Sequence, residues 1–292
     1  MKLGTCILEG KDTPVYIKKD VSAAGPLRDM GYGCPDLNEL IRESTPELLG
    51  LIREEGEKAE GIPLDRVRLC APIPYPVRVL GLGLNYQEHS DEMAEALQEE
   101  KKERLYPIYW EKGVDRCPGP GEEIPSHADF ISTLDYETEL AVILAKDAKH
   151  VAPEDVKSYV FGYSMLNDVT ARELNRHKQN YFMKSLDGTC PMGPWIVTAD
   201  EIAYPPELRI RCHVNGESRQ DGNTRDMIFG IDEIVGEITK GVTLPAGTVI
   251  ATGSPTGIGF GMKPPVYLKD GDVCRCEIEG IGVLENRVSD EI

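Results

Sequence analysis

The sequence predicts an α+β fold that is mainly β, with a small N-terminal α/β appendage and a larger second unit. Two observations support this prediction. The C-terminal third consists of short strand-like runs separated by tight turns such as Asn215-Gly216 and Lys269–Asp272. The chain also lacks the regular alternation of strands and helices that is typical of a doubly wound sheet. We therefore expect an irregular β-sandwich or roll.

Residues 1–70 are assigned to the N-terminal unit. Strand-like runs are predicted at Thr5–Leu8 and Pro14–Ile17, followed by an amphipathic helix over Asp36–Glu43. A second helix is predicted to begin at Thr45-Pro46, because threonine is a favourable N-cap and proline is tolerated in a first helical turn.

The second unit is assigned to residues 71–292, because three prolines within residues 72–76 mark a boundary. A buried strand is predicted over residues 77–84, followed by a helix over Ser90–Leu97 with Ser90 as its cap. The later predicted elements are a short helix opened by Pro153, a helix over Gly230–Lys240, and strands over Asp135–Leu144, Val160–Val169, Leu208–Val214 and Val273–Ile278.

The net charge of −18 argues against nucleic acid or an anionic membrane as a partner, because phosphate binding requires clustered lysine and arginine. No apolar run approaches the roughly 20 residues of a membrane-spanning helix, and no signal peptide opens the chain, so we expect a cytoplasmic protein. The eight cysteines form no CxxC pair, and Cys274 and Cys276 alternate with charged residues as inward-facing strand positions do. We interpret them as buried core thiols rather than a zinc or disulfide framework.

Glu137 and Glu139 alternate on a predicted strand and form the most informative pattern in the chain. Side chains two apart in a strand lie on the same face, so two carboxylates meet there and lead into the apolar run Leu140–Leu144. Like charges in a half-buried place need a cation between them, and oxygen ligands favour a hard ion such as Mg²⁺, Mn²⁺ or Ca²⁺. For an isolated pair a solvated edge strand is the simpler explanation, so the metal interpretation depends on the segments below.

His89 lies where a predicted strand passes into a helix, and Glu92 follows three residues later. In the first helical turn these two side chains can lie on one face. A carboxylate beside an imidazole orients the ring and raises its basicity, as general-base catalysis requires. A surface histidine with an ordinary N-terminal acid is the alternative, and the two residues alone do not decide between them.

Three further segments carry polar groups in chemically useful places. Asp168 ends an apolar strand and can be a third oxygen ligand, with Arg172 able to meet a substrate carboxylate; a helix cap and a surface arginine are the alternative. Lys184, in a Gly/Pro-rich loop, can present a point charge to an anion, although a solvated loop lysine fits as well. Ser254 lies in the glycine-rich turn Thr252–Gly257, whose backbone can approach a ligand or serve only as a turn.

Taken in order, these segments resemble the fumarylacetoacetate hydrolase family over residues 72–290. The motifs that carry the resemblance are Gly83–Tyr86 with His89 and Glu92, Asp135–Leu140, Asn167–Arg172, Lys184–Asp187, Asn215–Gln220 and Thr252–Gly257. The resemblance implies a β-sandwich roll, usually dimeric and often with a variable N-terminal domain, so we expect a homodimer.

The resemblance also implies roles for individual residues. The implied metal ligands are Glu137, Glu139 and Asp168; the implied catalytic residues are His89, Glu92 and Lys184; and the implied substrate-binding residues are Arg172, Asn175 and Ser254. The chain departs from the family pattern in three places. Asn175 stands where relatives that bind small 2-oxoacids often carry glutamine, and Ser254 replaces the threonine of a frequent Gly-Thr-Pro turn. Tyr181 and Phe182 stand near the lysine loop, which a tryptophan commonly precedes in the family. These departures affect the substrate more than the chemistry.

The function implied is that of a divalent-metal-dependent hydrolase of the acylpyruvase or fumarylpyruvate hydrolase type, with Mg²⁺ the expected ion. Its substrate would be a small anionic 2,4-dioxoacid, cleaved at a carbon–carbon bond by a water that His89 activates, through a metal-bound enolate. The same site could decarboxylate, isomerise or hydrate a related 2-oxoacid of the oxaloacetate or 2-hydroxymuconate type. A non-catalytic ion-binding protein is disfavoured, because binding alone does not require the His89–Glu92 base.

Overall fold

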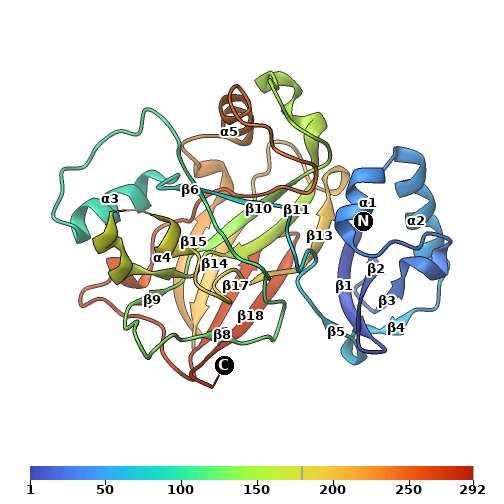
Figure 1. Ribbon diagram of the computed structural model, residues 1–292, viewed down its shortest axis with the longest axis horizontal. Helices are drawn as coiled ribbons and strands as arrows, with labels where there is room; N and C mark the ends of the chain where they lie inside the picture. Colours follow the sequence, from blue (N-terminus) through green and yellow to red (C-terminus); the bar gives the residue numbers. More distant parts are fainter. Residues whose placement is uncertain (179, 292) are drawn as a thin grey trace.

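The computed structural model describes residues 1–178 and 180–291 and confirms the mainly β α+β architecture (Figure 1). Two mixed sheets pack against each other around a shared apolar core, and the helices lie at the periphery. A short third pair, β9 (Leu134–Asp135) with β12 (Thr170–Ala171), lies beside the ends of the central strands. No helix among the described residues has the length and apolar content needed to cross a bilayer.

The larger sheet runs in the order β4-β3-β2-β1-β13-β11-β10-β16-β6-β7, with β5 paired to β1. Its strands are β1 (Lys2–Leu8), β2 (Lys11–Ile17), β3 (Ala23–Pro26), β4 (Ile62–Pro63), β5 (Arg68–Leu69), β6 (Val79–Gly83), β7 (Ile108–Glu111), β10 (Thr138–Leu144), β11 (Val160–Asn167), β13 (Met192–Thr198) and β16 (Val249–Ala251). All its described pairs are antiparallel except β16 with β6.

The smaller sheet runs in the order β15-β14-β17-β18-β8. Its strands are β8 (Ile124–Pro125), β14 (Arg209–Val214), β15 (Glu217–Asn223), β17 (Val273–Ile278) and β18 (Gly282–Ser289). The α-helices are α1 (Leu37–Glu43), α2 (Pro46–Lys58), α3 (Gln87–Ala96), α4 (Asn180–Lys184) and α5 (Ile231–Ile238). Short 3₁₀ turns lie at η1 (Leu27–Met30), η2 (Leu64–Arg66), η3 (Pro153–Tyr159), η4 (Arg172–His177), η5 (Ala199–Glu201), η6 (Thr224–Asp226) and η7 (Gly259–Gly261).

Strand β10 is buried on both faces, which explains why its sequence is continuously apolar after Glu139. Leu140 and Val142 face the core between the two sheets, together with residues of β14 and β17. Ala141 and Ile143 face the opposite core, together with residues of β13 and α1. By the same alternation Thr138 faces the inter-sheet core, whereas Glu139 faces the other way.

The strands of residues 1–70 continue the large sheet, because β1 pairs with β13 through Leu3 and Ile196. Helices α1 and α2 lie beside these strands, as Figure 1 shows at the blue end of the chain. The predicted cap is confirmed, since the Thr45 hydroxyl accepts a hydrogen bond from the Leu48 amide at 3.2 Å. The division of the chain at residues 70 and 71 stays a prediction.

One local prediction is wrong. Helix α3 begins at Gln87, not after Ser90, which is buried inside the helix and accepts a hydrogen bond from Arg104 Nε at 3.0 Å. Tertiary contact therefore replaces the expected capping role of Ser90. The short helix predicted to open at Pro153 is confirmed and is a 3₁₀ helix, Pro153–Tyr159. The Asn215-Gly216 hairpin is confirmed, with φ of 53° and 80° at its two turn residues.

Candidate metal centre and active-site pocket

Three carboxylates converge at one end of the β10–β11 pair. Glu137 immediately precedes β10, Glu139 is its second residue, and Asp168 immediately follows β11. The antiparallel register places Asp168 opposite Glu137, and the Asp168 amide donates to the Glu137 carbonyl at 2.8 Å. One carboxylate oxygen from each residue lies within 4.8 Å of the others, and all three residues are buried. These distances suit a single ion with oxygen ligands.

Basic side chains compensate the charge of this acidic triad (Glu137, Glu139 and Asp168). The Lys184 ammonium lies 2.5 Å from Glu137 Oε2 and also pairs with Asp168. Arg172 donates from Nη2 to Glu137 Oε1 at 2.5 Å. Lys112, which is fully buried, lies 2.7 Å from Asp168 Oδ1. Glu139 is bonded differently, since its Oε2 accepts the Gly253 backbone amide at 2.8 Å.

This unequal pairing splits the acidities of the two glutamates. Burial acts to raise the pKa of Glu137, but the charges of Arg172 and Lys184 outweigh it and hold that pKa well below its ordinary value. Burial, and then the charges of Asp168 and Glu137, raise the pKa of Glu139 well above its ordinary value. A negative charge on Glu139 is therefore not fully compensated by the basic side chains around the triad. A divalent cation fits this donor set, because it would supply the missing positive charge.

His89, which is buried, and Glu92, which is partly buried, form a pair that faces the triad. They lie three residues apart on α3, with His89 Nδ1 3.1 Å from Glu92 Oε2. The other ring nitrogen, Nε2, lies 3.8 Å from Glu137 Oε1. Glu92 is itself held by the Gly257 amide, which donates to Oε1 at 2.9 Å. The imidazole is thus oriented by one carboxylate and directed toward the acidic triad by its other nitrogen.

A pocket of about 240 Å³ opens onto these groups. Of the residues with predicted roles, those that line it are His89, Glu137, Glu139, Arg172, Asn175, Lys184 and Ser254. Asp168 and Glu92 do not line the pocket themselves. They contact residues that do, because Asp168 pairs with Lys184 and Glu92 pairs with His89. Ser254 is buried and accepts a hydrogen bond from Gln220 Nε2 at 2.7 Å. An apolar wall of the pocket is formed by Leu82, Met93, Leu97, Ile108, Met183 and Phe260.

The sequence predicted that Arg172 would be available to a substrate carboxylate. In the structure it is already bound to two carboxylates of the protein. Its Nε donates to Asp135 Oδ2 at 2.8 Å, in addition to its bond to Glu137. Asp135 is fully buried and also accepts the backbone amides of Gly259 at 2.7 Å and Phe260 at 3.1 Å. Asp135 therefore fixes Arg172 relative to the loop that carries the pocket residue Phe260.

Sequence reasoning missed Lys112, Trp110 and the tethering role of Asp135. Trp110 lies directly across from Gly81 in the β6–β7 pair, and its ring centroid is 4.8 Å from the Lys184 ammonium. A Cβ added at Gly81 would approach the indole to 2.2 Å, so glycine leaves the room that the ring occupies. Asp135 opens the motif that contains both glutamates and could have been noticed there. No local signal marks Lys112, because its burial arises from tertiary packing.

The model of the family described as "Fumarylacetoacetate (FAA) hydrolase C-terminal" matches residues 78–289, most of the chain. The chain belongs to the fumarylacetoacetate hydrolase family. It is 43% identical over 227 residues to the oxaloacetate tautomerase YisK of Bacillus subtilis, covering 77% of this chain and 74% of the relative. This membership confirms the resemblance drawn from the motifs.

Solved structures of the family share the whole architecture. A fumarylacetoacetate hydrolase from Exiguobacterium antarcticum is 37% identical, with a TM-score of 0.80 and coverage of 99% of both chains. A maleylpyruvate hydrolase from Sphingobium, solved with manganese(II) and pyruvate, is 27% identical, with a TM-score of 0.78 and coverage of 99% of both chains. The family therefore contains enzymes of different reaction types. The manganese in that relative and the buried acidic triad here together support a divalent metal ion.

Proposed function

We propose that this protein is a divalent-metal-dependent tautomerase that interconverts the keto and enol forms of a small anionic 2-oxoacid of the oxaloacetate type. The observation that carries the proposal is the His89–Glu92 pair facing the acidic triad, with His89 Nε2 3.8 Å from Glu137 Oε1. Tautomerisation needs one oriented base that removes a proton from carbon and one acid that delivers a proton to oxygen. The 43% identity to an oxaloacetate tautomerase supports this choice among the reactions of the family.

The proton transfers are assigned to His89. Because Nδ1 faces the Glu92 carboxylate, we assign the proton of the neutral imidazole to Nδ1, which leaves Nε2 free to accept one. Nε2 takes the proton from the carbon next to the keto group, and the Glu92 charge stabilises the imidazolium that forms. The imidazolium then returns that proton to the enolate oxygen, so that no net proton is gained or lost.

Glu137, Glu139 and Asp168 would hold the ion, which when bound supplies Lewis-acid polarisation of the keto group. Lys184 and Arg172 add fixed positive charge at the same end of the pocket, where a substrate carboxylate can be bound. Asn175 and Ser254 can hydrogen-bond the remaining substrate oxygens. The apolar wall formed by residues such as Met93 and Phe260 excludes water from the reacting carbon.

A second candidate is the hydrolysis of a carbon–carbon bond in an acylpyruvate. The apolar wall favours it, because such a surface can accept an uncharged acyl group. The hydrolases among the structural relatives add support. In this reaction His89 would take its proton from water rather than from carbon. A fumarylpyruvate-type substrate fits less well, because the described basic residues of the pocket all lie at the acidic end.

The test is a comparison of substrates with one enzyme preparation. The decay of freshly dissolved enol oxaloacetate is followed by its ultraviolet absorbance, and acetylpyruvate cleavage is followed by mass detection of pyruvate. We expect accelerated loss of the enol, suppression by EDTA and recovery with Mg²⁺ or Mn²⁺. Pyruvate release from acetylpyruvate without enol acceleration would replace the first candidate by the second. Full activity in EDTA would remove the metal from either proposal.

The assembly state accompanies this proposal. We propose a homodimer, and light scattering on the purified chain measures it directly. A monomeric mass at micromolar concentration would contradict it.

A further inference from the structure

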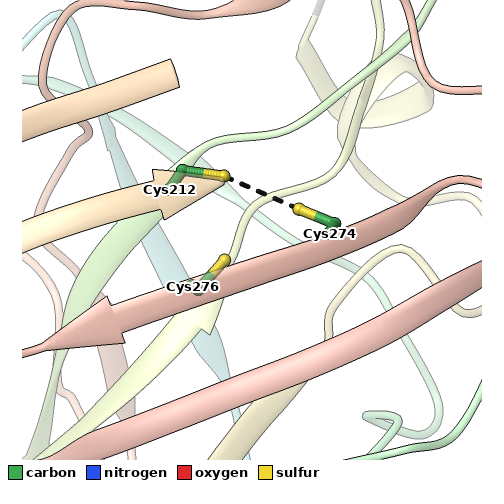
Figure 2. Close-up of side chains that lie close together, drawn as sticks. All are labelled: Cys212, Cys274 and Cys276. Atoms are coloured by element: carbon green, nitrogen blue, oxygen red, sulfur yellow. Dashed lines mark hydrogen bonds between the residues drawn. The ribbon is translucent and has the colours of Figure 1, made fainter. Parts of the chain in front are cut away.

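Three cysteines converge between the two sheets. Cys212 lies on β14, and Cys274 and Cys276 lie on the neighbouring strand β17, with Cys212 directly opposite Cys276. The three sulfur atoms lie within 4.8 Å of one another, and those of Cys212 and Cys274 are 3.7 Å apart. Figure 2 shows the thiols directed toward a common centre. All three residues are at most 1% exposed.

This thiol cluster (Cys212, Cys274 and Cys276) belongs to the apolar core between the sheets, but two polar side chains, Asn167 and Thr138, lie beside it. The Asn167 side-chain amide donates to Cys274 Sγ at 3.4 Å. The Thr138 hydroxyl, which neighbours the thiols of Cys212 and Cys276, is completely buried and has no hydrogen-bond partner among the described residues. A buried hydroxyl without such a partner is costly, so its place beside the sulfurs suggests a built polar site.

We propose that Cys212, Cys274 and Cys276 form a binding site for one soft monovalent metal cation, of which Cu(I) is the representative. Thiolate and thiol sulfurs select such ions over hard ones. A three-coordinate ion with metal–sulfur bonds of about 2.3 Å requires sulfurs roughly 4 Å apart. The sulfurs of Cys212 and Cys274 are 3.7 Å apart, and no pair of the three sulfurs is more than 4.8 Å apart. This range includes the required distance of roughly 4 Å.

Coordination number distinguishes this ion from zinc. In the described part of the chain the group offers three ligand atoms and no fourth histidine, cysteine or carboxylate. Structural zinc sites are almost always four-coordinate, whereas a three-sulfur site suits Cu(I). The acidic triad, made of oxygens, would retain a hard ion such as Mg²⁺. The protein would then sort two classes of metal between two sites.

The two sites lie on opposite sides of the same strand pair. Thr138, which faces the thiols, stands between Glu137 and Glu139 on the chain. Asn167, which donates to Cys274, also accepts the Glu137 backbone amide at 3.0 Å through its side-chain oxygen. Binding of a metal ion by the thiol cluster therefore requires none of the three carboxylates of the acidic triad. The proposal is independent of the tautomerase assignment.

The experiment uses reduced, full-length protein under anaerobic conditions with saturating Mg²⁺. Cu(I) is titrated in competition with bicinchoninate, and binding is followed to equilibrium because the buried site will exchange slowly. We expect one tightly bound Cu(I) per chain and an X-ray absorption spectrum with three sulfur neighbours. A spectrum dominated by nitrogen or oxygen, or no Cu(I) retained against the chelator, would overturn the proposal.

Variants locate the site. Cys274→Ala and Cys276→Ala should each weaken Cu(I) binding at least roughly tenfold. Cys190→Ala is the matched control, because Cys190 is equally buried and hydrogen-bonds another thiol, Cys117, outside the cluster. It should bind like the wild type. Cu(I) binding lost in Cys190→Ala but kept in Cys276→Ala would refute the assignment, and circular dichroism checks that each variant is folded. If a cluster variant does not fold, the sulfur count of the wild-type spectrum decides alone.

Discussion

Removing the charge of Lys112 tests whether the acidic triad depends on buried cations. Lys112 is fully buried, and its ammonium lies 2.7 Å from Asp168 Oδ1 and 3.0 Å from the Val169 carbonyl oxygen. Lys112→Met keeps most of the side-chain volume and leaves Asp168 with Lys184 as its remaining cationic partner. Breaking a buried ion pair by removing one partner costs about 3–5 kcal/mol. Because Lys184 remains, we expect a loss near the lower end, about 3 kcal/mol.

Urea unfolding measures this loss in EDTA and in saturating Mg²⁺. The loss should be smaller with Mg²⁺, because a bound divalent ion replaces the positive charge that Asp168 has lost. Lys263→Met is the matched control, since it removes a lysine–carboxylate pair with Glu95 that is exposed, and it should unfold like the wild type. A loss in EDTA below about 1 kcal/mol, or an equal loss with and without Mg²⁺, would refute the reasoning.

Three other perturbations test the site. His89→Gln should lower kcat by roughly 10²–10⁴ with little change in Mg²⁺ affinity by calorimetry; wild-type turnover would exclude His89 as the base. Because burial raises the pKa of Glu139, its proton must leave before the ion binds, so the Mg²⁺ Kd should fall as pH rises toward that pKa and level off above it. A Kd independent of pH would contradict this. Gly81→Ala should displace the Trp110 ring and lower kcat/KM, whereas Gly50→Ala, whose Cβ would meet nothing within 4 Å, should not.

Most of the residues that form the site could be predicted from the sequence, but the contacts between them could not. The alternation of Glu137 and Glu139 and the spacing of His89 and Glu92 are local patterns, and the structure brings all four side chains to one place. The pairing of Arg172 with Asp135 could not be predicted. It depends on two segments whose distance is fixed only when β9 and β12 pair.

The sequence by itself determined the local features of this protein. Thr45 before Pro46 determined where a helix starts, and Asn215-Gly216 determined a hairpin turn. The alternating acids Glu137 and Glu139 determined a charged face at the start of a strand. These features depend on backbone preference and side-chain period, which act over a few residues.

Only the tertiary structure decided which distant groups meet. The β10–β11 register brings Asp168 to Glu137, packing buries Lys112 beside them, and the β14–β17 pair gathers thiols that the sequence presents as ordinary core positions. Such encounters are set by long-range strand pairing and by the cost of burying an unpaired charge, neither of which a local pattern records.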